Sequence, residues 1–206
     1  MKNFRRYLKR ALAVTLVLLV LCGVVYPLLL TAAGQAIFPK QANGSIVKVN
    51  GKAAGSEIVG QEFEGDQYFH GRISSVNYNT YTKEEKESGE YAGVASGSYN
   101  YANSNPELKE RMEKDLEQFL KEHPGVKAED VPAELLTASG SGLDPHISPE
   151  SAEVQIPTVA KNSGLSEEEV KKIVEENTEK KTLGVFGEER VNVLGCNLDI
   201  AAAMGK

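Results

Sequence analysis

The stretch ALAVTLVLLVLCGVVYPLLL, residues 11–30, decides how the chain is organised, because its twenty residues include no charged side chain. A helix of that length spans about 30 Å, which matches the hydrocarbon thickness of a bilayer. Surface helices of soluble proteins carry an apolar stripe and a polar face, whereas this run is apolar all round. It therefore predicts a transmembrane helix rather than a buried core helix.

The charges on either side of this run predict its orientation. The first ten residues carry five basic side chains and no acidic one, and the next basic residue after the run is Lys40. Because basic flanks stay in the cytoplasm, we expect a cytoplasmic tail over residues 1–10 and an extracytoplasmic chain from about residue 31 onward. A cleaved signal peptide is the alternative, with small residues at 31–36 as cleavage sites, but signal peptides have shorter apolar regions of about 7–15 residues.

The remainder predicts a linker and one extracytoplasmic domain. Residues 31–44 contain turn-forming pairs, and residues 45–206 are enough to bury a core. Only 18 of the 23 basic residues lie beyond the tail, against 29 acidic ones, so the domain is acidic and disfavours nucleic acid as a partner. Cys22 lies in the apolar run and Cys196 near the far end of the chain, so we do not expect them to pair. We expect Cys196 to be a buried core thiol rather than a nucleophile.

Strand and helix signals alternate irregularly in this domain, which predicts an α+β fold. Asn50-Gly51 predicts a hairpin between a strand at 45–49 and a second stretch ending at 57–61. Asn105 and Pro106 predict the start of a helix that ends at residues 123–125. The other predicted elements are a short strand at 135–137, helices from Pro149 and over 167–178, strands at 182–186 and 190–194, and a final helix over 198–204 capped by Asn197.

Two segments hold the candidate functional residues. Residues 65–105 are rich in Gly, Ser, Asn and Tyr without a clear period, so they either pack through their aromatic side chains or dock on a partner. Residues 137–149 hold several reactive side chains, yet neither Ser139 nor Ser141 has the G-x-S-x-G setting of a hydrolase elbow, which favours a structural turn over a catalytic triad. The histidines lack zinc-type spacing, and no catalytic, cofactor-binding or metal-binding residue is predicted.

A set of motifs in fixed order resembles one family. Behind the basic start and a span ending YPLLLTAAGQAIFPKQANGS come GSEIVGQEF, YFHGR, TASGSGLDPHISP, QIPTVAKNSGLSEEEV and TLGVFGEERVNVL. Together they cover nearly the whole chain and resemble the C subunit of the Kdp potassium-transporting ATPase. The resemblance implies a non-catalytic accessory subunit of an ATP-driven potassium uptake complex, which assembles or stabilises the complex and supports ATP binding by the catalytic subunit indirectly.

The resemblance also implies partners. These are a channel-like potassium-binding subunit, a P-type ATPase subunit, a small single-span subunit and the lipid bilayer, with ATP and potassium handled by the complex. The alternative is a membrane-anchored ligand-binding ectodomain acting alone. We expect nine residues to form interface or structural motifs: Tyr68, Phe69, His70, Arg72, Ser139, Ser141, Asp144, His146 and Arg190.

Overall fold

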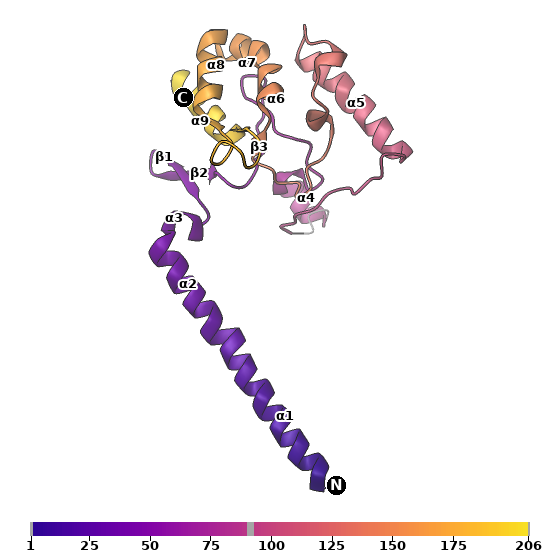
Figure 1. The fold of residues 1–206 in the computed structure, drawn as a ribbon. Coiled ribbons are helices and arrows are strands. Elements are labelled where there is room, and N and C mark those ends of the chain that lie inside the picture. Colours follow the sequence, from indigo (N-terminus) through magenta and orange to yellow (C-terminus); the bar gives the residue numbers. More distant parts are fainter. Residues whose placement is uncertain (1, 90–92, 206) are drawn as a thin grey trace. The chain divides into compact units, whose positions relative to one another are not determined.

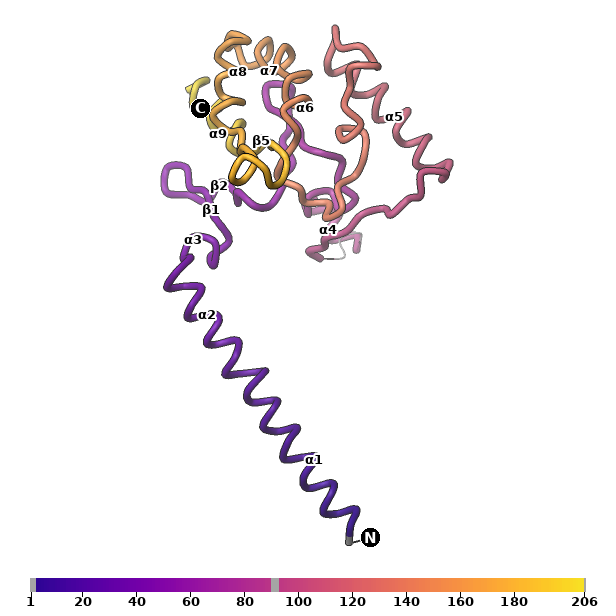
Figure 2. The backbone as a smooth tube through the Cα atoms, in the orientation of Figure 1, coloured from indigo at the N-terminus to yellow at the C-terminus, as the bar shows by residue number. Residues whose placement is uncertain are grey.

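The computed structural model describes residues 2–89 and 93–205 of the chain. It divides into two compact units, Met1–Ile46 and Val47–Lys206, which are described separately below. Figure 1 shows the elements of both units, and Figure 2 traces the same backbone as a tube.

The first unit is essentially one long helix. It comprises α1 (Lys2–Val20), a π-helical turn η1 (Leu21–Val25), α2 (Tyr26–Ile37) and a further short turn of helix, α3 (Pro39–Ala42). Of these, residues Asn3–Ile37 form a 35-residue helix that is apolar enough to cross a membrane, and its most apolar window is 0% buried. The helix therefore extends beyond the predicted 11–30 and into the predicted linker, and it is not the core of a soluble domain.

The π-helical turn ends at Val25, two residues before Pro27. Proline has no N–H and clashes with the carbonyl one turn earlier, so it interrupts the regular α-helical ladder. Here the backbone N–H of Tyr26 donates to the carbonyl of Leu21, five residues back. This local widening is a usual way for a helix to accommodate such an interruption without ending.

A β-hairpin opens the second unit, as the Asn-Gly pair predicts. Strands β1 (Ile46–Val49) and β2 (Lys52–Ser56) are joined by Asn50 and Gly51, which both have positive φ, at 51° and 79°. The prediction placed the end of the second strand too late, at residues 57–61, because Ala53-Ala54-Gly55 has low intrinsic strand propensity. The tight two-residue turn nevertheless fixes the register and draws these small residues into the ladder.

In the described residues of the long segment that follows, the helices before α5 are all short. These are η2 (Asn77–Asn79) and α4 (Lys83–Ser88), the latter with a capping box between Thr82 and Glu85. Helix α5 (Pro106–Glu122) is confirmed, with Asn105 accepting a hydrogen bond from the N–H of Glu107 as its N-cap. The predicted strand at 135–137 is wrong: η3 (Ala128–Asp130) and the 3-10 turn η4 (Ala133–Leu136) occupy this region, and η4 buries two leucines.

A small antiparallel sheet lies in the C-terminal half of this unit. Its strands are β3 (His146–Ile147), β4 (Thr178–Glu179) and β5 (Arg190–Asn192), in the order β3-β5-β4. The register pairs His146 with Asn192 and Thr178 with Val191. The predicted strand at 182–186 is instead a tight hairpin with one bridge between Thr182 and Phe186, and the strand predicted at 190–194 ends at Asn192 because the next helix begins there.

Four helices enclose the core beside this sheet: α6 and α9 contact β5, and α8 packs against both α7 and α9 (Figure 1). They are α6 (Pro149–Glu153), α7 (Ile156–Ser163), α8 (Glu167–Glu176) and α9 (Val193–Ala203). The predicted capping box of Ser166 and Glu169 is confirmed at the start of α8. The predicted cap of the last helix is wrong, because Asn192 caps α9 and Asn197 lies buried in its interior.

The core confirms an α+β fold. Its buried members come from α6 to α9, from β3 and β5, from Leu135 in η4, and from Phe69, which lies outside the helices and strands. Cys196 is 0% exposed and unpaired, as predicted, and burial raises the pKa of its thiol to about 12, so it is an inert packing residue rather than a nucleophile.

Candidate functional site

The YFHGR motif is held in the core by two buried amide side chains. The Phe69 N–H donates to Oδ1 of Asn197 at 2.8 Å, and Nδ2 of Asn197 donates back to the Phe69 carbonyl at 2.9 Å. One residue later, Gln155 makes the same pair of hydrogen bonds with the backbone of His70, at 2.9 and 3.2 Å. The two amides thus take the place of a neighbouring strand, which satisfies backbone groups that are buried with the Phe69 ring.

Arg72 joins this motif to the TASGSGLDPHISP loop. Its Nη1 lies 3.4 Å from Oδ2 of Asp144, and its Nη2 donates to the carbonyl of Ala138. The backbones also meet, because the N–H of Ser139 donates to the carbonyl of Ile73 at 3.3 Å. Two motifs some seventy residues apart in sequence are therefore one structural unit, and the sequence could not show that pairing.

Asp144 begins a row of ionisable side chains that continues through His146 and Glu179 and ends at Arg190. Its Oδ1 caps the N–H of His146 at 3.0 Å, and the two ring nitrogens of His146 lie 3.9 Å from Asp144 and 3.9 Å from Glu179. Arg190 in turn donates two hydrogen bonds to Glu179, at 3.0 and 2.5 Å. Burial, together with the nearby Arg190, lowers the pKa of His146, against the opposing pull of Glu179 and Asp144. His146 is therefore held neutral at pH 7.

The two serines of the loop hold backbone rather than activating a nucleophile. Ser139 is buried at 2% exposure, and Oγ of Ser141 accepts a hydrogen bond from the N–H of Leu143 at 3.1 Å. In the part of the chain that the structure describes, no hydrogen bond joins either hydroxyl to His146. The geometry that would let His146 take a proton from a serine is not formed.

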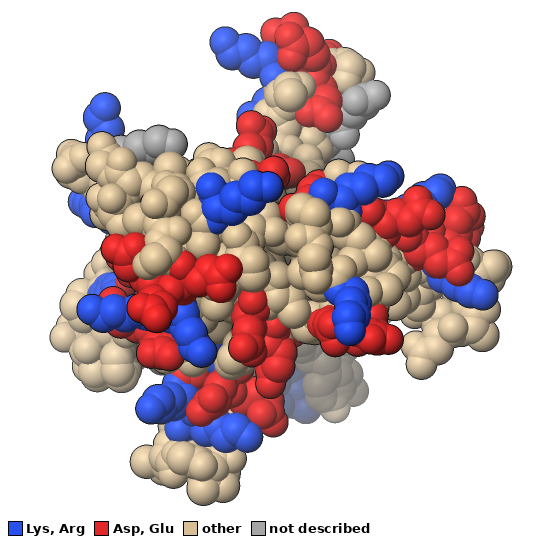
Figure 3. Space-filling view, turned by 90° about the horizontal axis from the view of Figure 1, so that it is seen from above, with Lys and Arg blue, Asp and Glu red and all other residues tan. Residues whose placement is uncertain are grey.

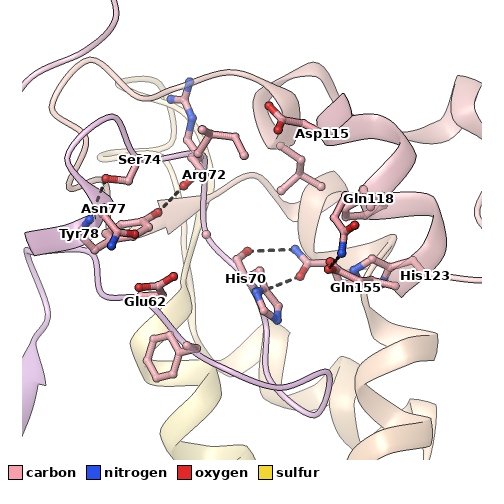
Figure 4. A pocket seen from close by; sticks show the side chains of 16 residues that line it. Glu62, His70, Arg72, Ser74, Asn77, Tyr78, Asp115, Gln118, His123 and Gln155 are labelled. Carbon is pink, nitrogen blue, oxygen red and sulfur yellow. Dashed lines mark hydrogen bonds between the residues drawn. The ribbon is translucent and has the colours of Figure 1, made fainter. Parts of the chain in front are cut away.

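A cavity of about 320 Å³ lies between the YFHGR motif and α5 (Figure 4). Its walls combine polar side chains such as Glu62 and Gln118 with the rings of Phe63 and Phe119. At one side, the hydroxyl of Tyr78 donates to the carbonyl of Arg72 at 2.5 Å. Burial, reinforced by the Asp144 carboxylate, raises the pKa of Tyr78 to about 12, so this hydroxyl stays protonated and keeps its bond.

His123 closes the other side of this cavity and is only 4% exposed. Its ring stacks on Phe119 with centroids 4.1 Å apart, and its Nδ1 is buried without a hydrogen-bond partner. Burial lowers the pKa of His123, and the nearby His70 adds to the effect, whereas Glu122 and Asp66 oppose it. The ring is thus a neutral packing group, and its buried Nδ1 is not open to the cavity.

A second, more open groove of about 700 Å³ lies beside β3 and β5. His146, Lys181 and Arg190 contribute to it, but its lining is mainly acidic. Figure 3 shows one face of the molecule, on which carboxylates gather in several clusters with basic side chains among them. The groove carries five carboxylates: Glu134, Asp144, Glu150, Glu188 and Glu189.

The role of these residues is mainly structural. Among the described residues, no group of three or more His, Cys, Asp or Glu side chains is arranged to hold a metal ion. Eight of the nine predicted residues belong to the two motifs that the Arg72–Asp144 contact joins, with Tyr68 packed against the core, and the ninth, Arg190, pairs with Glu179. These positions hold the domain together; whether any also touches a partner stays a prediction.

Sequence reasoning missed the residues that carry the arrangement. Asn197 and Gln155 hold the backbone of YFHGR, and Glu179 links His146 to Arg190. A weak signal exists for Asn197, since it is a single amide inside an apolar helical stretch, and a buried amide needs hydrogen-bond partners; Gln155 lies between two helices and gives no such signal. The sequence does not say which distant backbone provides them.

Comparison with known proteins gives one consistent family. A family model described as KdpC, the c chain of K⁺-transporting ATPase, matches residues 8–202. A potassium-transporting ATPase KdpC subunit of Clostridium kluyveri is 58% identical over 205 residues, which cover 100% of this chain and 98% of that protein. The proteins of the same name from Clostridioides difficile and Caldanaerobacter subterraneus are 57% and 48% identical, and each alignment covers at least 96% of both chains.

Proposed function

Since the chain belongs to the KdpC family and is a membrane subunit of the multi-subunit K⁺-transporting ATPase, we propose that it is a non-catalytic accessory subunit that assembles and stabilises that complex. The observation that carries this role is the 35-residue apolar helix Asn3–Ile37, whose most apolar window has no residue buried by the rest of the chain. Such a helix is stable only when lipid or other membrane helices surround it.

In this proposal the helix is a permanent anchor with its N-terminus in the cytoplasm. The five basic residues of the tail support that orientation under the positive-inside rule. The regular helix continues to Ile37, past the small residues at 31–36, which leaves no extended segment there for a signal peptidase. Intact-mass measurement of the purified protein tests this: retention of residues 1–30 supports the anchor, and their loss contradicts it.

The domain then lies outside the cytoplasm, so support of ATP binding by the catalytic subunit is indirect. The Gly/Ser tract at 95–100 is already engaged within the domain, because Oγ of Ser96 and the N–H of Gly97 both donate to the carbonyl of Ser141. We propose that coupling to the nucleotide site runs through the membrane helix and the basic tail. Labelling of the domain by a photoreactive ATP analogue in correctly oriented vesicles would contradict this route.

The proposed partners are the channel-like potassium-binding subunit, the P-type ATPase subunit and the small single-span subunit. We place the docking of the domain on the outer face of the channel-like subunit, where one span and one folded domain hold that subunit in register with the ATPase. No nucleic acid is expected as a partner, because the domain is acidic.

A mild-detergent pull-down of the tagged full chain from potassium-starved cells tests the proposal, with mass spectrometry of the recovered proteins. We expect stoichiometric recovery of a P-type ATPase subunit and a channel-like subunit. A matched control carries an unrelated membrane helix of equal length in place of residues 11–30, and it should recover less of the complex while staying membrane-bound. Recovery of the wild-type chain alone would contradict the proposal and favour an ectodomain that acts by itself.

A further inference from the structure

The hairpin at residues 182–187 exposes three large apolar side chains to solvent. Leu183 is 86% exposed, Val185 75% and Phe186 65%. The hairpin lies in the gold part of the chain that leads into β5 in Figure 2. Three such residues within four positions of one turn concentrate exposed apolar surface of the kind that marks an interaction site.

This hairpin is preorganised by its own backbone. The N–H of Thr182 donates to the carbonyl of Phe186 at 2.8 Å, and the N–H of Phe186 donates back to the carbonyl of Thr182 at 3.0 Å. The N–H of Gly184 also donates to the carbonyl of Lys181 at 2.9 Å. The apolar side chains are thus presented on a closed turn, so a partner that binds them orders little further backbone.

Leucine is an unfavourable residue type for the backbone conformation at position 183. The φ of Leu183 is +55°, a left-handed conformation that costs a residue with a Cβ about 1–2 kcal/mol and that glycine or asparagine adopts more readily. Its side chain is the most exposed of the large apolar residues, so it repays nothing through packing in the domain. Folding therefore gives no reason for a leucine here, and such local strain is typical of binding sites.

The charges around the hairpin point to the chemistry of its partner. Lys181 and Glu188 close its base with an ion pair at 3.1 Å, and both line the groove that carries five carboxylates. Glu189, beside them, makes no ion pair among the described residues. Insertion into a bilayer surface would bring these carboxylates against the lipid phosphates, which repel them, and would have to desolvate them. A protein pocket with an apolar centre and a basic rim satisfies both features.

We propose that the hairpin at 182–187 is the docking element of the domain, and that it inserts into an apolar pocket rimmed by Lys or Arg on the outer face of the channel-like subunit. This rests on the proposed function, because it names the residues and the chemistry of that contact. Leu183 and Phe186 fill the pocket, while the acidic groove behind them faces its basic rim.

Pull-down of the tagged full chain, co-expressed with the other subunits, tests this contact. We expect Leu183→Ser combined with Phe186→Ser to lower recovery of the channel-like subunit at least about tenfold, as loss of central apolar anchors does. Leu183→Gly, which relieves the backbone, should lower recovery while leaving the domain folded. The matched control is Val94→Ser, which removes a side chain that is 83% exposed in a different loop and should leave recovery within about twofold of wild type.

A second arm of the experiment tests the basic rim. Glu188→Lys with Glu189→Lys should reduce recovery further as ionic strength falls, because like charges repel more strongly in dilute salt. If wild type recovers the channel-like subunit and the hairpin variants recover it equally, the docking element is wrong and the proposed function stands. If wild type recovers no subunit, both fail. If the hairpin variants lose binding to lipid vesicles as strongly as they lose the channel-like subunit, or if they lose self-association instead, the assignment to a protein pocket on that subunit is wrong.

Discussion

Phe69 and Phe186 lie in segments that look alike in sequence and behave oppositely in the structure. Each is an aromatic residue with a glycine one or two positions later, in a stretch that forms neither a helix nor a paired strand. Phe69 is 1% exposed and belongs to the core, whereas Phe186 is 65% exposed.

The difference lies in where the backbone partners come from. Phe69 is held by Asn197, 128 positions away, and its neighbour His70 by Gln155, 85 positions away. Phe186 is held by Thr182, four positions away. A segment that is tied to distant helices is drawn into the core, while a segment that closes on itself keeps its apolar surface free. The first stabilises the domain and the second is left for a partner.

Truncation of the two phenylalanines is the sharpest test of this comparison. We expect Phe69→Ala to lower the free energy of unfolding by about 3–5 kcal/mol, because it removes a buried ring and leaves a cavity. Phe186→Ala should change it by no more than about 0.5 kcal/mol, because the ring is already in water. Urea denaturation of the full chain in detergent measures both values. Equal losses would mean that Phe186 stabilises the core as Phe69 does, so that the hairpin is not a free surface element.

The hydrogen bonds between Asn197 and the backbone of Phe69 should account for the next largest effect. Asn197→Ala leaves the buried N–H and carbonyl of Phe69 without partners, and we expect a loss of about 2–4 kcal/mol in the free energy of unfolding. Asn162→Ala is the matched control, because that exposed amide bonds the nearby carbonyl of Thr158 and should cost about 0.5 kcal/mol. Similar losses for the two variants in the same denaturation assay would show that the hydrogen bonds of Asn197 stabilise the domain no more than those of an exposed amide.

Local signals predicted the elements that depend on local chemistry. Ser166 with Glu169, Asn50 with Gly51, and Asn105 all make the caps and turns that their residue types favour. Asn197 was misread for the same reason: it resembles a helix cap, yet its amide binds Phe69 from the helix interior, and Asn192 is the cap. A short cap pattern carries no information about a hydrogen bond that spans 128 positions.

The candidate site was predictable as residue types but not as a geometry. The motifs around Arg72 and Asp144 stand out in the sequence, but the contact between them joins loops that have no regular secondary structure to place them. The link from His146 through Glu179 to Arg190 depends on the sheet order β3-β5-β4, in which strands from distant positions become neighbours. Neither periodicity nor spacing encodes that order when the strands are two or three residues long.

Lowering the pH should reduce the free energy of unfolding of the domain through the buried His123. Burial lowers the pKa of His123 in the folded state, so the unfolded chain binds the proton more readily. Stability is complete above the ordinary histidine value of about 6.5 and is lost as the pH falls from there through the folded-state value. Urea midpoints measured between about pH 7 and pH 5 should fall more for wild type than for His123→Phe, and parallel pH profiles would contradict a titrating His123.

The smallest expected effect concerns the cost of the left-handed backbone conformation of Leu183 in the hairpin. Leu183→Gly relieves a left-handed residue, a gain that exceeds the extra chain entropy of glycine, so we expect the free energy of unfolding to rise by about 0.5 kcal/mol. Val185→Gly is the matched control two residues away, because Val185 is not among the residues of positive φ and should lose about 0.5–1 kcal/mol to that entropy. Thermal unfolding of the full chain in detergent measures the opposite signs. If both variants are destabilised, Leu183 contributes to the fold itself, and its conformation no longer argues that it is kept for binding.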